Sequence, residues 1–289
     1  MINKILSVLL IFVPHPLNAF IRRMFGQNIG ENTHISIFSF VFSKKLLIGK
    51  NVKISPFSVV KANEVRLSDF SHIESFAIIN GPSIDGGNFE LGRHSRVFPF
   101  CWIEPGEGVY IGDHVGIGGH TLIFTHGSWS DYLHGGPVQF GPVYIEDHVW
   151  IPWRVFIMPG VTIGTRSIIA ANSTVVKSTA AHTLVAGSPG KVIKENINQE
   201  LSDEKFKTRI KHIFEEFEKY EKRTPNQSSQ LSELNVKFVR NDETIDKEKC
   251  ALSIDMNDYS YSVNKEVDGI NRFISFLRRY GIRLEEKKL

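Results

Sequence analysis

The chain has 289 residues, of which 42% are hydrophobic and 22% are charged, and its formal net charge is +3. These values are typical of a soluble globular protein with one main domain and an appendage, or with two domains. A net charge this small gives no overall field that would favour nucleic acid, so nucleic acid is not expected as a partner.

The N-terminal segment, residues 1–29, is apolar and amphipathic. Residues 5–13 form an apolar run after one lysine, but Pro14 and Pro16 follow it at once and the run is too short to span a bilayer. Residues 20–25 then carry two arginines among apolar side chains. Two interpretations stay open: a cap that covers the end of the fold, which we favour, and peripheral contact with the inner face of a membrane.

Residues 30–194 are organised by a six-residue repeat. Aliphatic residues recur at every sixth position, and the longest unbroken series is Ile145, Ile151, Ile157, Ile163, Ile169 and Val175. A period of six fits neither an amphipathic helix nor a simple alternating strand. It fits a coil with three faces of six residues each, in which the aliphatic side chains point inward and each coil is buried only by its neighbours. The sequence therefore predicts a solenoid of stacked coils.

The repeat is interrupted between Ile123 and Ile145 by a segment rich in glycine, proline and aromatic residues. Such a segment predicts a loop that leaves the solenoid, and long loops on rigid scaffolds often carry function. His126 lies at the point where this loop begins. The departure point is therefore the first place to look for a functional site.

The sequences around this interruption resemble those of the hexapeptide-repeat acyltransferases. Thr125-His126-Gly127, residues 141–145 (GPVYI) and Val149-Trp150-Ile151 are similar to the Thr-His, Gly-Pro-Ile-x-Ile-Gly and Val-Trp-Ile-Gly elements of sugar and antibiotic O-acetyltransferases. The resemblance covers roughly residues 30–194. It implies a left-handed parallel β-helix, a homotrimer with active sites between neighbouring subunits, and acetyl-CoA as co-substrate.

The resemblance also assigns the catalytic base of the family to His126. Transfer of acetyl from a thioester to a hydroxyl needs a base that accepts the hydroxyl proton near neutral pH, and histidine is the usual choice. No nucleophilic residue is needed, because the acceptor itself can attack the thioester. The alternative for His126 is a structural role in anchoring the loop.

The family's coenzyme A contacts can be carried over to several positions. Trp150 takes the place of a tryptophan that lines the acetyl end of the cleft, and Ala171 lies in the turn beside the pantetheine arm. Trp153, where relatives have a small residue, either stacks on a ligand, narrows the cleft or packs on a neighbouring subunit. The basic residues expected to meet the phosphates are Lys177, Lys191 and Lys194.

The acceptor contacts do not carry over from the family. Phe98 stands where sugar acetyltransferases often have an asparagine shortly before a cysteine. Glu104 and Asp131 are also candidates for orienting His126, and the sequence leaves that choice open. The candidate acceptor contacts are therefore Phe98, Glu104, Trp129, Asp131 and His134.

Residues 195–289 form an appendage outside the repeat. Their pattern predicts an amphipathic helix over 201–222, a polar linker over 224–230, short strands over 234–239 and 251–254, and a second helix over 267–280. This is a small α+β unit. Covering the end of the solenoid or strengthening a trimer is favoured over binding a carrier-linked acceptor.

The function expected from the residues and the resemblance is acetyl transfer from acetyl-CoA to a hydroxyl of a sugar or surface polysaccharide. The two cysteines suggest neither a disulfide framework nor a zinc site, so a cytoplasmic location is expected. No metal is expected either. The nearest alternative is an N-acetyltransferase on an amino sugar. A γ-carbonic-anhydrase-type hydratase is disfavoured, because His114, His120 and His126 fall on successive faces. A non-catalytic β-helix is the third alternative.

Overall fold

The chain divides into two units, residues 1–199 and 200–289. The computed structural model describes residues 7–81, 87–127, 131–223, 236–240, 250–264 and 269–287. The first unit extends five residues past the expected domain end at Lys194, because Ile197 donates its backbone N–H to the carbonyl of His182 at 2.9 Å. The Asn198 side chain also donates to the carbonyl of Arg166 at 3.0 Å.

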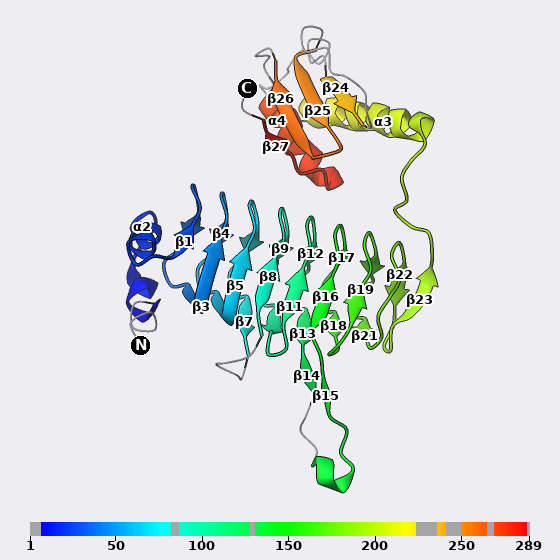
Figure 1. Ribbon diagram of the computed structural model, residues 1–289. Helices are drawn as coiled ribbons and strands as arrows, with labels where there is room; N and C mark the ends of the chain where they lie inside the picture. The colour runs from blue at the N-terminus through cyan, green and yellow to red at the C-terminus, as the bar shows by residue number, and fades with distance from the viewer. Residues whose placement is uncertain are drawn as a thin grey trace. The chain divides into compact units, whose positions relative to one another are not determined.

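The first unit is a parallel β-helix with three faces (Figure 1). The first face consists of β8 (Phe89–Leu91), β11 (Val109–Ile111), β16 (Val143–Ile145) and β19 (Thr162–Ile163). The second face consists of β7 (Ile78–Asn80), β10 (Trp102–Glu104), β13 (Leu122–Phe124), β18 (Phe156–Ile157) and β21 (Thr174–Val175). The third face consists of β2 (His34–Ile35), β4 (Lys53–Ile54), β6 (His72–Ile73), β9 (Arg96–Val97), β12 (Gly116–Ile117), β17 (Trp150–Ile151), β20 (Ile168–Ile169) and β22 (Leu184–Ala186).

Two long strands join the first two faces into one sheet. They are β3 (Phe40–Ile48) and β5 (Val59–Leu67), and β1 (Asn28–Ile29) pairs with β3. At the other end of the β-helix, β23 (Lys191–Lys194) pairs antiparallel with β22. The antiparallel strand ends the stack of parallel coils.

The six-residue repeat forms the core of the β-helix. The six aliphatic residues from Ile145 to Val175 are at most 1% exposed, so the inward direction expected for them is confirmed. Of the six residues that lie four positions later, all except Thr179 are buried as well. Val149, Val155, Val161, Ser167 and Ser173 are each at most 2% exposed. Each six-residue face therefore buries two side chains, and the predicted solenoid is a parallel β-helix.

One corner of the β-helix carries a ladder of phenylalanines. Phe38, Phe57, Phe76 and Phe100 have φ angles between 60° and 62°, a left-handed conformation that is costly for bulky residues. Their rings stack in order at centroid distances of 5.5, 5.3 and 5.2 Å. Aromatic pairs of this kind contribute about 0.5–1.5 kcal/mol beyond burial, which offsets part of the backbone cost.

The N-terminal end of the β-helix is capped by two short helical elements, η1 (Leu10–Phe12) and α2 (Leu17–Met24) (Figure 1). Helix α2 packs against β1 and β2. Among the described residues, no helix is long and apolar enough to cross a membrane.

The interruption of the repeat forms a hairpin that projects from the β-helix (Figure 1). Its base is the antiparallel pair β14 (His126–Gly127) and β15 (Gln139–Phe140). The short helix η2 (Tyr132–His134) lies toward its tip. The expected loop therefore leaves the β-helix at His126.

The second unit combines two helices with a four-stranded sheet. The helices are α3 (Asp203–Lys222) and α4 (Ile270–Leu277), which continues into η5 (Arg278–Tyr280). The sheet contains β24 (Val236–Val239), β25 (Leu252–Asp255), β26 (Ser260–Val263) and β27 (Glu285–Glu286), in that order. Phe217, Leu252 and Phe273 are fully buried in its core. The expected linker over 224–230 lies outside the described residues.

Candidate active site

The centre of the candidate site is a contact between Glu104 and His126. Glu104 is the last residue of β10, and His126 follows the neighbouring strand β13 in the same face. Because Glu104 pairs with Phe124 in the parallel register, His126 lies two residues beyond the partner position. The Nδ1 atom of His126 is 2.6 Å from the Oε2 atom of Glu104.

Glu104 is buried and held by several donors. Its side chain is 3% exposed, against 31% for His126. The Oε1 atom accepts the backbone N–H of Gly106 at 2.6 Å, and the Oε2 atom accepts the hydroxyl of Thr125 at 2.8 Å and its N–H at 3.3 Å. The Thr125 hydroxyl in turn accepts the backbone N–H of Glu107 at 3.0 Å. A carboxylate fixed in this way holds the imidazole ring in one orientation.

The contact defines which ring nitrogen is available. A carboxylate can only accept, so Nδ1 carries the proton in the neutral ring and Nε2 keeps its lone pair. His126 can therefore accept a proton at Nε2, which is the role that a general base requires.

The sequence leaves two roles open for Glu104, contact with the acceptor and orientation of His126. Both carboxylate oxygens are buried and bonded to the protein's own donors, and one of them contacts His126, which favours the second role. Thr125 and Gly106 were not expected to contribute. The contact between Glu104 and His126 could have been found from the length of one coil. Ile103 and Ile123 pair in adjacent coils, which brings Glu104 beside the start of the loop.

Asp131 and His134 lie on the projecting hairpin and contact each other. The Nδ1 atom of His134 is 2.6 Å from the Oδ2 atom of Asp131, and their side chains are 84% and 59% exposed. The other oxygen of Asp131 accepts the N–H of Leu133 at the start of η2. The carboxylate of Asp131 is thus bonded within the hairpin, whereas the carboxylate that contacts His126 is that of Glu104. Trp129 lies outside the described residues.

Trp150 and Phe98 lie together on the third face, although the sequence assigned them to different ligands. Their rings meet edge to face at 6.3 Å. Trp150 is 40% exposed and lies over Gly116, where a Cβ atom would be 2.6 Å from the ring. His126 lies at the corner between the second and first faces. The chain therefore does not bring Trp150 and His126 onto one face.

Trp153 lies at the corner between the third and second faces. It is 48% exposed, and its ring is 5.9 Å from that of His120. Gly119 makes room for it, since a Cβ atom there would be 2.5 Å from the indole. His120 itself stacks on Phe100 at 5.0 Å and so extends the phenylalanine ladder.

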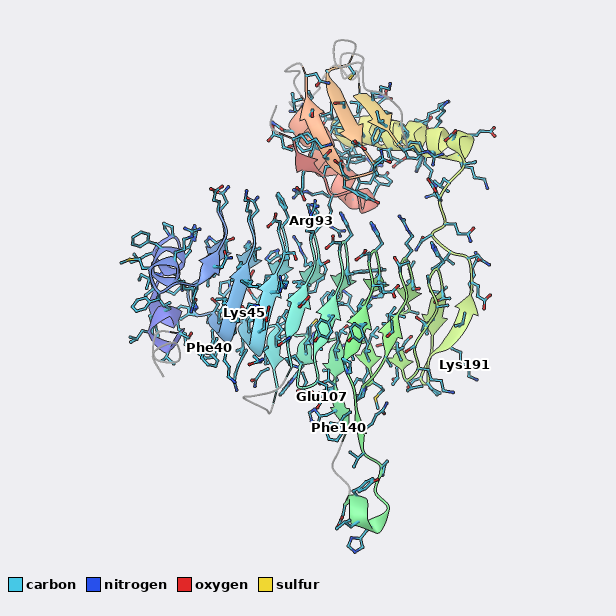
Figure 2. The ribbon with its side chains drawn as sticks, viewed as in Figure 1. Phe40, Lys45, Arg93, Glu107, Phe140 and Lys191 are labelled. Carbon is cyan, nitrogen blue, oxygen red and sulfur yellow. The ribbon has the colours of Figure 1, made fainter. Side chains whose placement is uncertain are left out.

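The remaining expected cofactor contacts are exposed and lie toward the C-terminal end of the β-helix. Ala171 is in the turn after β20, and Lys177 follows β21 on the same corner as His126. Lys191 and Lys194 are the two ends of β23 (Figure 2 labels Lys191). All three lysines are accessible to an anionic ligand.

The other histidines of the repeat have separate structural surroundings. His114 stacks between His94 and His148 at 5.0 and 4.9 Å, on a different corner from His126. Within the described part of the chain, no three histidine, cysteine or acidic side chains are grouped so that they could hold a metal ion. Burial raises the pKa of the Cys101 thiol to about 12, which makes it a poor nucleophile.

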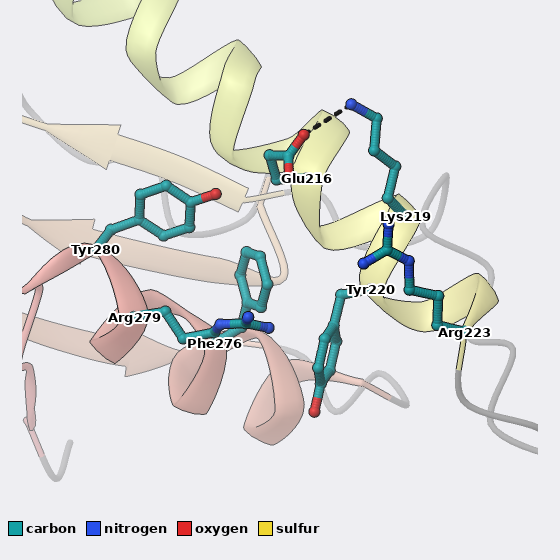
Figure 3. Close-up of a pocket in the computed structure, with 7 residues that line it drawn as sticks. All are labelled: Glu216, Lys219, Tyr220, Arg223, Phe276, Arg279 and Tyr280. Atoms are coloured by element: carbon teal, nitrogen blue, oxygen red, sulfur yellow. Dashed lines mark hydrogen bonds and ion pairs between the residues drawn. The ribbon is translucent and has the colours of Figure 1, made fainter.

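Two cavities of the second unit contain none of the expected site residues. One, of about 320 Å³, has Lys219, Arg223 and Arg279 around Tyr220 (Figure 3). The other, of about 380 Å³, lies between α3 and the sheet and is mostly apolar. The candidate site at His126 is instead an open corner of the β-helix.

The family model described as bacterial transferase hexapeptide (six repeats) matches residues 142–177. A Schizosaccharomyces pombe protein assigned as an acetyltransferase is 37% identical over 93 residues, which are 32% of this chain and 45% of that protein. WcaF of Escherichia coli, assigned as a colanic acid biosynthesis acetyltransferase, is 30% identical over 110 residues, 35% of this chain and 58% of WcaF. The chain thus spans about half the length of these curated relatives.

Two solved structures of acetyltransferases are similar to this chain. The hexapeptide-repeat acetyltransferase VCA0836 of Vibrio cholerae, complexed with acetyl coenzyme A, is 25% identical with a TM-score of 0.38, over 68% of this chain and 86% of that chain. A maltose O-acetyltransferase of Clostridium difficile is 22% identical with a TM-score of 0.36, over 68% and 85%. Over the buried six-residue repeat, the chain is therefore similar to hexapeptide-repeat transferases and to proteins assigned as acetyltransferases.

Proposed function

We propose that the chain is an acetyl-CoA-dependent O-acetyltransferase, with His126 as general base and a sugar or surface polysaccharide as acceptor. The similarity to these transferases supports the acyl transfer. WcaF, assigned to colanic acid biosynthesis, supports a polysaccharide acceptor. A cytoplasmic location and a left-handed winding of the coils are parts of the same proposal.

One observation carries the assignment of the base, namely the 2.6 Å contact between Glu104 and the Nδ1 atom of His126. A histidine that only anchors a loop needs no buried carboxylate behind it. Burying a carboxylate costs free energy unless its oxygens are well bonded, and here four donors from Gly106, Thr125 and His126 surround it. Such an arrangement places the proton of the neutral ring on Nδ1, so that Nε2 faces away from the carboxylate with its lone pair available.

The reaction then has a simple balance. The acceptor hydroxyl oxygen forms a bond to the thioester carbonyl carbon, while its proton passes to Nε2 of His126. The negative charge that forms on the carbonyl oxygen needs backbone N–H donors in the cleft. When the C–S bond breaks, His126 returns the proton to the departing sulfur. The products are an acetyl ester and coenzyme A with a free thiol, and His126 is neutral again. Glu104 stabilises the imidazolium that exists between the two transfers.

The positions of Trp150 and His126 support a homotrimer with shared active sites. Trp150 belongs to the third face, whereas His126 lies at the opposite corner between the other two faces. If both contribute to one site, the site must combine residues from two subunits. The cofactor would then lie between subunits, with its phosphates toward Lys177, Lys191 and Lys194 and its pantetheine arm beside Ala171.

The first test is thiol release from acetyl-CoA by the purified protein, with and without a panel of neutral sugars, amino sugars and polysaccharide fragments. Release that is stimulated by a hydroxyl acceptor, with an acetyl ester as product, is expected. An amide product from an amino sugar would instead establish N-acetylation. Absence of both release and coenzyme A binding would leave a non-catalytic β-helix.

The shared site can be tested by mixing two inactive variants. His126→Ala and Trp150→Ala are produced separately, then unfolded and refolded together, with each variant alone as control. If the two residues come from different subunits, mixed trimers contain some intact sites and regain part of the activity. If every site is contained within one subunit, no activity returns.

A further inference from the structure

Helix α2 turns polar side chains toward the β-helix and apolar side chains toward solvent, the reverse of an ordinary surface helix. It buries two of its three polar side chains, since Asn18 is 0% and Arg22 is 1% exposed, and only Arg23 is exposed. The guanidinium of Arg22 donates to Asn18 Oδ1 and Gln27 Oε1 at 2.9 Å and to the carbonyl of Val41 at 3.1 Å. Burial lowers the pKa of Arg22 to about 10. These bonds fix the polar face of the helix against the β-helix.

Apart from Arg23, the large exposed side chains of η1 and α2 are consequently apolar. Phe20 is 55% and Met24 is 71% exposed, although side chains of this size normally lie in a core. The apolar surface continues along both elements and their flanks. We call it the N-terminal apolar surface, and it comprises Val8, Leu9, Phe12, Leu17, Phe20, Met24 and Phe25, each at least 50% exposed. Several large apolar side chains exposed on neighbouring turns are typical of an interaction site.

The coils beside this surface are strongly basic. Residues 7–61 contain seven lysines and arginines and one acidic residue, Glu31, although the whole chain has a net charge of only +3. Arg23, Lys50 and Lys53 are exposed in α2 and the first coils. The rest of the chain is therefore net acidic, and positive charge is concentrated at the end that carries the apolar surface.

We propose that the N-terminal apolar surface docks onto an anionic lipid surface. Apolar side chains that enter the acyl boundary, next to cations that attract lipid phosphates, are the combination that binds peripheral proteins to membranes. A second copy docking through the same surface would bring two basic ends together, which charge repulsion opposes. The inference is independent of the proposed acetyl transfer, because it uses no residue of the candidate active site.

The test is flotation of the full chain with vesicles of phosphatidylcholine, and with vesicles that contain about one third phosphatidylglycerol. Binding to the anionic vesicles alone is expected, and it should weaken steeply between about 0.1 and 0.5 M salt. Phe20→Asp combined with Met24→Asp should reduce it by about tenfold or more. Ile193→Asp is the matched control, since Ile193 is 62% exposed at the opposite end of the β-helix.

The outcomes separate the proposal from its rivals. Circular dichroism checks that the variants are folded, and both substituted side chains are exposed, so a folded double variant is expected. Failure of the wild type to bind anionic vesicles would overturn the proposal, as would binding retained by the double variant. A fall in oligomeric mass in the double variant without vesicle binding by the wild type would assign the surface to contact between copies. The assay contains no acetyl-CoA, so its result is independent of catalysis.

Discussion

Glu104→Gln is the sharpest test of how the site works, because it removes a charge with almost no change of shape. The amide has one oxygen and one NH₂ group, whereas all the groups around the carboxylate donate: Gly106 N–H at Oε1, and Thr125 and His126 at Oε2. If the NH₂ group faces His126, the ring must accept at Nδ1 and carry its proton on Nε2. If it faces Gly106, two N–H donors oppose each other.

The expected magnitude follows from these two arrangements. The first leaves the base in the wrong tautomer, and the second loses a charge-assisted bond worth about 1.5–3 kcal/mol and leaves an opposed donor. Loss of the charge that stabilises the imidazolium adds to either. We expect kcat to fall by about 10²–10⁴-fold, or about 3–5 kcal/mol, while KM for acetyl-CoA changes little.

The assay is steady-state thiol release, together with ¹⁵N NMR of the His126 ring, which reports the tautomer directly. Glu107→Gln is the matched control: Glu107 lies three residues away on the same corner, its side chain is exposed, and the charge change is identical. A Glu104→Gln enzyme with kcat within about threefold of wild type would refute the positioning role. So would an equal loss in Glu107→Gln.

Three further predictions concern other parts of the β-helix. Burial, and to a smaller extent the charges of Arg96 and Lys53, lower the pKa of His72 to about 3. The unfolded chain therefore takes up a proton at His72 below about pH 6.5 while the folded protein does not, so stability is full above that pH and falls as the pH decreases toward 3. Urea unfolding should show stability falling by up to about 1.4 kcal/mol per pH unit in this window, and less in His72→Gln. Gly116→Ala should displace the indole of Trp150, because the new Cβ would be 2.6 Å from the ring; tryptophan fluorescence and coenzyme A affinity should change with little loss in Tm. Lys191→Glu with Lys194→Glu should weaken coenzyme A binding in calorimetry by about three- to tenfold at low salt and less at high salt, whereas unchanged affinity at low salt would place the phosphates elsewhere.

The β-helix could be predicted because its stabilising interactions are periodic. Each coil buries the same inward positions, so the aliphatic residues at every sixth position, such as Ile145 and Ile151, mark the buried positions in the sequence itself. The phenylalanine ladder could not be predicted in the same way. Phe57 and Phe76 occupy left-handed corner positions that local preferences assign to glycine or asparagine, and only stacking between coils accounts for them.

The site was predictable in part. His126 stood out because the repeat breaks there. Whether Glu104 or Asp131 contacts it depends on the register between β10 and β13, and a shift of two residues would change the answer. In the second unit, β26 has serines at its buried positions Ser260 and Ser262, so it lacks the apolar alternation that marks a strand. The two-residue strand β27 exists only through its pairing with β26, and no local pattern could reveal it.

The most direct test of the central claim is the activity of His126→Ala beside that of the wild type, with coenzyme A binding measured on both by calorimetry. We predict that acceptor-dependent thiol release falls by several orders of magnitude in the variant, while its oligomeric mass and its affinity for coenzyme A are unchanged. Activity retained in His126→Ala would contradict the account, because the proton of the acceptor would then be taken by another group.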